Sequence, residues 1–254
     1  MLAQVQILLS ALFILFAIIS IMHQKISVII PTLNEEHYIR RSLGSLKKQT
    51  FKDFEIIVVD GHSTDKTLII AKRYGARVVS AARRGPWNAK NVGAKKARGK
   101  LLLFLDADTA VPRDYLSMIS EELKNTRVAL IGPEVRMDAP LHYRVMLKLV
   151  YAMFILLGCI NRAPAVMAVA CRKKDFLSIG GFPARRLGED VEFSRKMSRL
   201  GNVVIRNHCV TSPRRFKREG FFRLCAIYTF SLVEFLLTGK MSHKGYEFGA
   251  FGKN

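Results

Sequence analysis

Short apolar segments alternate with helical segments through the first half of the chain, and this alternation restricts the fold more than any other feature. The strand-like segments are KISVIIPT (25–32), FEIIVVD (54–60) and LLLFLD (101–106). Residues 35–49 and 64–75 lie between them and have the charge pattern and end residues of helices. Nearly continuous apolar strands connected by helices are typical of a parallel sheet that is covered on both faces. The sequence therefore predicts an α/β fold.

Polar and acidic residues follow each of the three predicted strands. They are residues 31–35 after the first strand, 60–63 after the second and 106–108 after the third. Because the carboxyl ends of parallel strands lie at one edge of the sheet, these segments are expected to converge although they are far apart in the sequence. Ligands of open α/β sheets bind beyond that edge. The sequence thus predicts a binding site there.

Asp106 and Asp108 follow the third strand with one residue between them, so their side chains are expected on the same side. Two carboxylates this close raise each other's pKa unless a cation lies beside them. A divalent cation fits, because Mg²⁺ and Mn²⁺ take oxygen ligands and commonly bridge carboxylates to phosphates. We therefore expect a Mg²⁺ or Mn²⁺ site at Asp106 and Asp108.

The first 22 residues contain no charged side chain, and a membrane span needs about 20 apolar residues. They lack the basic start and the small-residue cleavage site of a signal peptide. Lys25 follows directly, and further basic residues follow up to Lys48. The positive-inside rule then places the remainder in the cytoplasm. We expect residues 1–24 to form one transmembrane anchor; a cleaved segment and a buried helix are the alternatives.

The composition is strongly basic, with 41 Lys plus Arg against 20 Asp plus Glu and a formal net charge of +21. Such a surface attracts phosphate, whether in a nucleotide, a nucleic acid or anionic lipid headgroups. The basic residues are dispersed, and no known nucleic-acid-binding motif is present. We therefore expect no nucleic-acid partner.

The four cysteines are Cys159, Cys171, Cys209 and Cys225, and they form no CxxC or Cys/His metal-binding spacing. Free thiols in a reducing compartment are the expected state.

Two long apolar segments occupy the second half of the chain, at residues 142–160 and 221–239. Each contains charged residues, so a helix on the membrane surface is favoured over a full span. Two core helices are an equal alternative. Residues 219–254 then form a C-terminal region with an apolar helix and a basic tail.

Several segments resemble, in order, the sequence blocks of family-2 glycosyltransferases. They are SVIIPTLNEE, EIIVVDGHSTDKT, NAKNVGAKKARGKLLLFLDADT and GGF, followed by LGEDVEFSRKM. The resemblance runs from about residue 25 to residue 215. It implies the GT-A fold, a mostly parallel sheet flanked by helices in a domain spanning residues 25–218. It also implies sugar transfer with inversion from a nucleotide-diphosphate donor.

The resemblance also implies roles for single residues. Asp106 faces the sugar nucleotide, and Asp108, with Asp106 beside it, holds the metal. Asp60 contacts the base or ribose, although Gly61 stands where relatives often have a second acid. The other residues implied for nucleotide-sugar binding are Pro31, Thr32, Asn34, Glu35, Arg84, Lys90 and Asn91.

Glu189 and Asp190 match the acidic pair that contains the catalytic base in the family. Asp190 is the expected base, because a carboxylate at a helix start is stabilised in its charged form. The alternative is a pair of acids that serve only the helix dipole. Arg214 and Arg215 resemble basic residues near the diphosphate of the donor; contact with lipid headgroups is an equal alternative.

Taken with the predicted anchor, the resemblance implies a metal-dependent inverting glycosyltransferase that uses a UDP- or GDP-linked sugar. The location favours a membrane-linked acceptor, such as a polyprenyl- or dolichol-type lipid or a lipid-linked saccharide. The alternative is a non-catalytic, membrane-anchored basic protein that binds nucleotide or nucleic acid. A nicotinamide-dependent dehydrogenase is disfavoured, because no GxGxxG follows the first strand.

Overall fold

The computed structural model of the protein describes residues 25–81, 85–156, 167–184 and 188–238. Strands and helices alternate through the first half of this part, as predicted, whereas in the second half helices twice follow one another with no strand between them. The elements are β1 (Ile26–Thr32), α2 (Ile39–Lys47), β2 (Phe54–Asp60), α3 (Thr67–Arg73), β3 (Arg77–Ser80), α4 (Pro86–Lys96), β4 (Leu101–Leu105), α5 (Tyr115–Glu122), β5 (Val128–Met137), α6 (Leu141–Leu156), β6 (Ala168–Arg172), α7 (Lys173–Ser178), α8 (Glu189–Met197), β7 (Asn202–Thr211), α9 (Arg214–Glu219) and α10 (Phe221–Thr238).

The strands form one seven-stranded sheet in the order β3-β2-β1-β4-β6-β5-β7. β1 pairs in parallel with β2 and β4, β2 with β3, and β5 with β7. β6 is antiparallel to both of its neighbours. The sheet is therefore mostly parallel, as expected, and the antiparallel β6 joins its two parallel parts.

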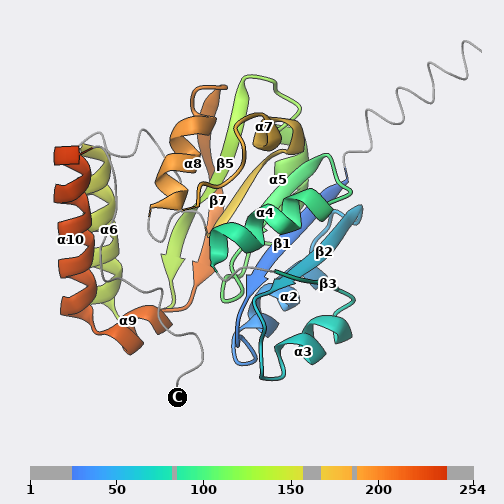
Figure 1. The fold of residues 1–254 in the computed structure, drawn as a ribbon, viewed down its shortest axis with the longest axis horizontal. Coiled ribbons are helices and arrows are strands. Elements are labelled where there is room, and N and C mark those ends of the chain that lie inside the picture. The colour runs from blue at the N-terminus through green and yellow to red at the C-terminus, as the bar shows by residue number, and fades with distance from the viewer. Residues whose placement is uncertain (1–24, 82–84, 157–166, 185–187, 239–254) are drawn as a thin grey trace, which may run out of the picture.

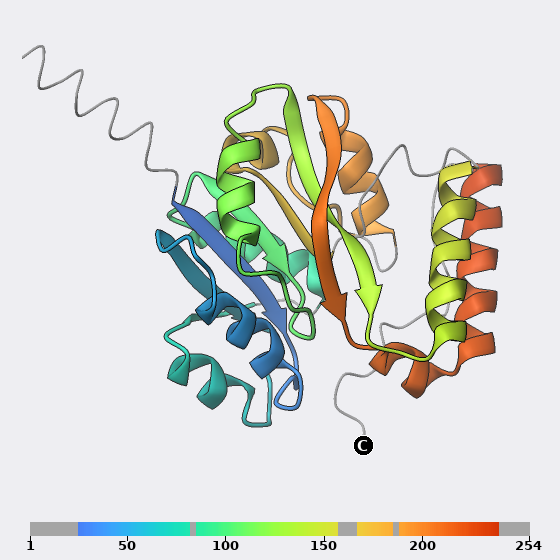
Figure 2. The same cartoon turned by 180° about the vertical axis from the view of Figure 1, so that it is seen from behind.

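Helices cover both faces of the sheet. In Figure 1, α4, α7 and α8 lie in front of the strands, and Figure 2 shows α2, α3 and α5 on the opposite face. Alternate residues of β1 serve the two layers: Val28 and Ile30 pack with the α2 side, and Ile29 packs with the α4 side. α4 lies so close to β1 that a Cβ on Gly93 would be 2.4 Å from Ile29 Cγ2. The predicted coverage of both faces is confirmed.

The first predicted helix begins later than expected. α2 starts at Ile39, so the prediction of a helix from residue 35 was wrong for its first turn. The backbone N–H of Glu35 donates to Thr67 Oγ1 at 2.7 Å, and that of Glu36 donates to Asp65 Oδ2 at 3.0 Å. Because these bonds hold the segment against the start of α3, Glu35 lies in a loop at the carboxyl edge of the sheet.

α6 and α10 lie side by side beyond β5 and β7, apart from the helices that cover the sheet (Figures 1 and 2). Among the helices that the structure describes, none is both long and apolar enough to cross a membrane. The predicted anchor, residues 1–24, lies outside the described residues.

Candidate active site

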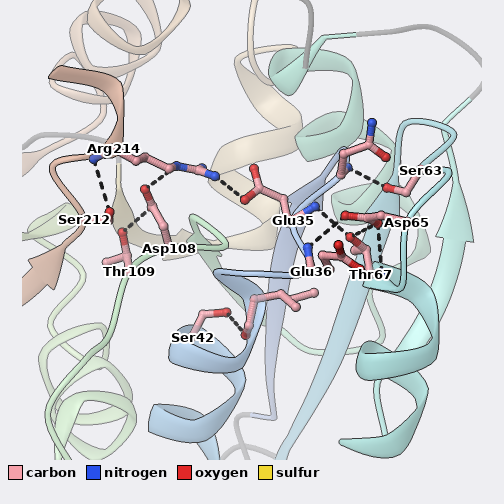
Figure 3. A network of polar contacts seen from close by, with 12 residues as sticks. Glu35, Glu36, Ser42, Ser63, Asp65, Thr67, Asp108, Thr109, Ser212 and Arg214 are labelled. Atoms are coloured by element: carbon pink, nitrogen blue, oxygen red, sulfur yellow. Dashed lines mark hydrogen bonds and ion pairs between the residues drawn. The ribbon is translucent and has the colours of Figure 1, made fainter. Parts of the chain in front are cut away.

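The carboxyl edge of β1, β2 and β4 brings together acidic residues from distant parts of the sequence. Thr32 and Asp60 pair at the ends of β1 and β2, and β4 runs parallel to β1 on its other side. Just beyond these ends, Glu35 and Asp108 lie on either side of Arg214 (Figure 3). The predicted convergence of the strand ends is confirmed.

Arg214, the first residue of α9, links two of the acids. Its Nε lies 2.8 Å from Asp108 Oδ2, and its Nη1 donates to Glu35 Oε2. Its guanidinium also stacks over the ring of Tyr38, 4.5 Å from the centroid. One planar cation thus contacts two carboxylates and an aromatic face, an arrangement that suits arginine better than lysine.

Asp108 is held from its other side by two threonines. Thr109 Oγ1 donates to Asp108 Oδ1 at 3.2 Å, and Thr211 Oγ1 lies 3.4 Å from the same oxygen. Thr211 is the last residue of β7, so this strand also contributes to the site. Sequence reasoning missed Thr211 and Tyr38. The position of Thr211 at the end of a strand, three residues before Arg214, is the signal that could have found it.

Burial raises the pKa of two of these acids. The pKa of Asp106 rises to about 6 because the group is buried and Asp108 is nearby, while Lys90 acts in the opposite direction. The pKa of Glu35 rises to about 7, mainly through burial, although Arg214 lowers it. A further cation beside Asp106 and Asp108 would favour their charged forms.

Asp106 and Asp108 provide the kind of ligand atoms that Mg²⁺ and Mn²⁺ prefer. Both residues supply carboxylate oxygens, and the pKa of the half-buried Asp106 is raised, mainly by its removal from water and also by the neighbouring Asp108. The chemistry of this pair therefore fits a divalent ion. In the described part of the chain, no three His, Cys, Asp or Glu side chains are grouped as a metal site.

Glu189 and Asp190 begin α8, as the sequence predicted, and lie within electrostatic range of Asp106 and Lys90. Glu189 is buried, and its pKa rises to about 7 because of burial first and of Asp190 second. Asp190 is half-buried, and its Oδ1 accepts a hydrogen bond from the backbone N–H of Val191 at 2.9 Å. Asp190 is therefore the more solvent-accessible acid of the pair.

Lys90 is buried on α4, with its Nζ 4.9 Å from the centroid of the Phe182 ring. It lowers the pKa of both Asp106 and Glu189. A buried lysine placed among acids acts as their counterion, and it provides a positive charge that a phosphate could share.

Asn91, which the resemblance implies at the donor, bonds the backbone of Phe182 in this structure. Its Nδ2 donates to the Phe182 carbonyl at 2.8 Å, and its Oδ1 accepts from the Phe182 N–H at 2.9 Å. Phe182 also stacks on Phe193 of α8, with ring centroids 4.1 Å apart. Asn91 thus ties α4 to the turn that precedes the acidic pair.

Asp60 accepts four hydrogen bonds from its own neighbourhood. The donors are Thr32 Oγ1, the backbone N–H groups of His62 and Ser63, and Ser63 Oγ. Asn34 has a left-handed backbone (φ 54°), and its Oδ1 accepts from the Thr64 N–H at 2.8 Å. These bonds fix the two loops that end β1 and β2 against each other.

The remaining predicted residues divide into two groups. Pro31 is half-buried and Thr32 is buried, both at the end of β1, on the edge that carries the site. Arg84 and the side chain of Arg215 lie outside the described residues.

Comparison with known proteins decides the family. The sequence model described as glycosyl transferase family 2 matches residues 27–210, which is most of the chain and includes every acid of the site. The chain belongs to glycosyltransferase family 2.

One family member is the poly(ribitol-phosphate) beta-N-acetylglucosaminyltransferase TarS of Staphylococcus aureus. It is 40% identical to this chain over 100 residues, which are 36% of this chain and 18% of TarS. The match thus spans about a fifth of that relative's length.

Solved structures of glycosyltransferases show the same GT-A fold. The Staphylococcus aureus TarS 1–349 structure with UDP-GlcNAc gives a TM-score of 0.59 at 24% identity, covering 74% of this chain and 58% of that chain. The mannosyltransferase PcManGT of Pyrobaculum calidifontis, with GDP-Man and Mn²⁺, gives a TM-score of 0.65 at 22% identity, covering 82% and 61%.

Proposed function

We propose that this protein transfers a sugar from a UDP- or GDP-linked donor to an acceptor, with inversion at the anomeric carbon. One observation carries the proposal: in a family-2 domain, Asp106, Asp108, Glu189 and Asp190 gather with Lys90 and Arg214 at one edge of the sheet. Carboxylates and fixed cations are what a site needs to hold a metal, a diphosphate and a reacting hydroxyl.

Donor binding is assigned to the cations and the aspartate pair. Asp106 and Asp108 would hold Mg²⁺ or Mn²⁺, which would neutralise negative charge on the diphosphate when bound. Arg214 already contacts Asp108, so its guanidinium is placed to pair with phosphate oxygens beside that residue. The mannosyltransferase that shares this fold was solved with GDP-Man and Mn²⁺, which supports the choice of ligands.

Asp190 is the proposed catalytic base. It accepts the proton of an acceptor hydroxyl while that oxygen forms a bond to the anomeric carbon. The bond from the anomeric carbon to the diphosphate oxygen breaks, and the nucleotide diphosphate leaves with the electron pair. The half-buried position of Asp190 supports this role, because a base must be reached by an external acceptor.

The acceptor is proposed to be linked to a membrane lipid. Residues 1–24 would anchor the chain, residues 25–218 would form the catalytic domain in the cytoplasm, and residues 219–254 would add an apolar helix and a basic tail. The length and apolar character of residues 1–22 support the anchor. TarS acts, by its name, on a poly(ribitol phosphate), and the net charge of +21 here also suits an anionic acceptor.

A donor screen tests the proposal. Purified protein is mixed with Mn²⁺ or Mg²⁺, membrane lipid extract and a panel of UDP- and GDP-sugars, and release of nucleotide diphosphate is measured. We expect release with one donor class and loss of release in Asp190→Asn. Glu192→Gln is the matched control, because Glu192 lies on the same helix and pairs with Lys196 at 3.4 Å.

Two outcomes would contradict parts of the proposal. Near-full transfer by Asp190→Asn would remove the base role. A folded protein that binds no donor, but binds polynucleotide with steep salt dependence, would favour the non-catalytic alternative.

A further inference from the structure

α6 and α10 expose rows of apolar side chains that the catalytic domain does not cover. On α6 the row is Leu141, Val145 and Leu149, spaced four residues apart, and Leu141 is 71% exposed. On α10, Phe222, Phe230, Val233 and Leu237 fall on one helical face, and Leu237 is 80% exposed. We call these seven residues the α6–α10 surface. Each helix thus exposes a row of apolar side chains, and exposed apolar patches of this kind mark interaction sites.

α10 also has buried apolar residues, which are separate from its exposed row. Leu224 is buried on the side of the helix away from Phe222 and Val233, and the buried Ile227 lies at the border between the two sides, one turn before Phe230. A helix that buries apolar residues on one side and exposes others can contact two partners. For α10, the buried side packs within the protein, where α6 and α10 lie side by side (Figures 1 and 2).

Exposed basic residues lie on the same helices as the α6–α10 surface. The exposed basic residues of α6, α9 and α10 are Arg144, Lys148, Lys217, Arg218 and Arg223. The described acids on these helices are Glu219 and Glu234. By helical spacing, Lys148 borders the row on α6 and Arg223 borders the row on α10. An apolar face edged by lysine and arginine fits lipid chains beneath anionic headgroups.

We propose that the α6–α10 surface docks in the headgroup region of an anionic lipid bilayer. A second copy of this chain is a poorer partner, because it would bring the same basic residues together.

Docking would place the candidate active site near the lipid surface. α6 and α9–α10 follow β5 and β7, whose last residues, Met137 and Thr211, are paired. Thr211 Oγ1 contacts Asp108, and Arg214 begins α9. The apolar surface therefore starts at the same edge as the acids. Docking itself does not depend on sugar transfer.

A fluorescence experiment on the full chain tests the docking. Cys159→Ser and Cys225→Ser remove two thiols, and a single new thiol is introduced by Leu149→Cys or by Leu237→Cys and labelled with NBD. The protein is reconstituted in phosphatidylcholine vesicles with or without phosphatidylglycerol, and nitroxide-labelled lipid serves as quencher. Ile69→Cys is the control, because Ile69 is 54% exposed on α3 in the part of the domain opposite α6 and α10. All variants carry the same N-terminal segment.

We expect the quencher to remove most of the emission from the Leu149→Cys and Leu237→Cys probes in anionic vesicles and little from the Ile69→Cys probe. Lys148→Gln with Arg223→Gln should reduce the docked-to-undocked ratio about fivefold for each charge removed. Quenching of all three probes to the same extent would overturn the proposal. NBD emission that changes with the amount of protein per vesicle, and not with lipid charge, would also overturn the proposal, because it would assign the surface to a second copy of the chain.

Donor turnover is measured separately on the same vesicles. The quenching measurement contains no donor, so docked protein without turnover would contradict the proposed function and leave the docking intact. Turnover with unquenched probes would contradict the docking and leave the proposed function intact. Cys171 and Cys209 are buried and should stay unlabelled in every variant, which reports a native fold.

Discussion

Arg214 Nε lies 2.8 Å from Asp108 Oδ2, and the same guanidinium bonds Glu35. The contact joins the start of α9 to the loops after β4 and β1, three segments that are remote in sequence. It places a permanent positive charge directly beside the proposed metal ligand. The charge therefore stabilises the folded site before any ligand binds, and it lies where a diphosphate would need a partner.

Arg214→Gln is expected to weaken both stability and transfer. The substitution leaves Glu35 buried without its cation, and loss of one partner of a buried pair costs about 3 kcal/mol. Loss of a cation beside the leaving group is expected to lower turnover by about 10²–10³-fold. The stability and the turnover of Arg214→Lys should lie between those of the wild type and those of Arg214→Gln, because an ammonium cannot contact both carboxylates in one plane. Urea unfolding and nucleotide diphosphate release measure the two effects.

Arg41→Gln serves as the control for Arg214. Arg41 pairs with Asp138 at 3.6 Å on the surface, and exposed pairs contribute about 0–1 kcal/mol. Equal urea midpoints for Arg214→Gln and Arg41→Gln would show that the bridge to Glu35 and Asp108 adds no stability.

The sequence predicted the sheet and the edge that carries the site, because both follow from local patterns. Apolar runs define β1, β2 and β4, and the direction of parallel strands brings their ends together. The antiparallel β6 was not predicted. Four of its five residues, Ala168 to Cys171, are buried by neighbours that come from distant segments, and a run this short carries little pattern of its own.

The partners of the site residues were beyond sequence reasoning for a similar reason. The Arg214–Glu35 contact spans 179 positions, and no spacing rule connects such residues. Asn91 was predicted at the donor from its motif, and no pattern in the sequence indicated that its amide also bonds the backbone of Phe182. A motif identifies which residues belong to a site, whereas the tertiary fold decides which of them touch the ligand and which hold the others in place.

Gly181→Ala is expected to destabilise the protein more than Gly180→Ala. Both glycines have left-handed backbones, with φ of 72° and 79°, so an alanine at either position costs about 1–2 kcal/mol. A Cβ on Gly181 would also lie 2.5 Å from Asn91 Oδ1 and 2.9 Å from the Phe176 ring, whereas nothing lies within 4 Å at Gly180. The two urea midpoints measure the difference.

The same pair of variants tests the role of Asn91 in holding the turn before Glu189 and Asp190. When turnover is measured without urea and at low temperature, it should fall in Gly181→Ala and stay near the wild-type value in Gly180→Ala. Equal stability and equal turnover in the two variants would contradict the tight contact between Asn91 and this turn.

Cys171 and Cys209 are expected to resist alkylation in the folded protein. Both are free and buried; burial raises the pKa of the Cys209 thiol to about 12 and that of the Cys171 thiol further. Because the thiolate is the reactive form, iodoacetamide at pH 8 should label neither group. Mass spectrometry of Cys159→Ser/Cys225→Ser, folded and in urea, should show no adduct and two adducts respectively. Two adducts on the folded protein would disprove the burial.

Glu189 is expected to make folding less stable as the pH rises. Its pKa is raised from 4.5 to about 7 in the folded state, first by burial and then by Asp190. Between these values the folded chain keeps a proton that the unfolded chain has lost, so the free energy of unfolding falls with rising pH. The contribution is complete below pH 4.5 and is lost as the pH passes 7. Its full size is on the order of 3 kcal/mol.

Glu189→Gln removes this titration and should therefore stabilise the protein relative to wild type at pH 8 more than at pH 5. Urea midpoints of both proteins at the two pH values measure the effect, and subtraction cancels the contributions of Glu35 and Asp106, whose pKa values are raised as well. Glu121→Gln is the control, because the Glu121 side chain is 73% exposed and should give the same difference at both pH values. If Glu189→Gln, like Glu121→Gln, differed from wild type by the same amount at both pH values, Glu189 would titrate as a solvated acid. That result would contradict the burial of Glu189 beside Lys90 at the start of α8.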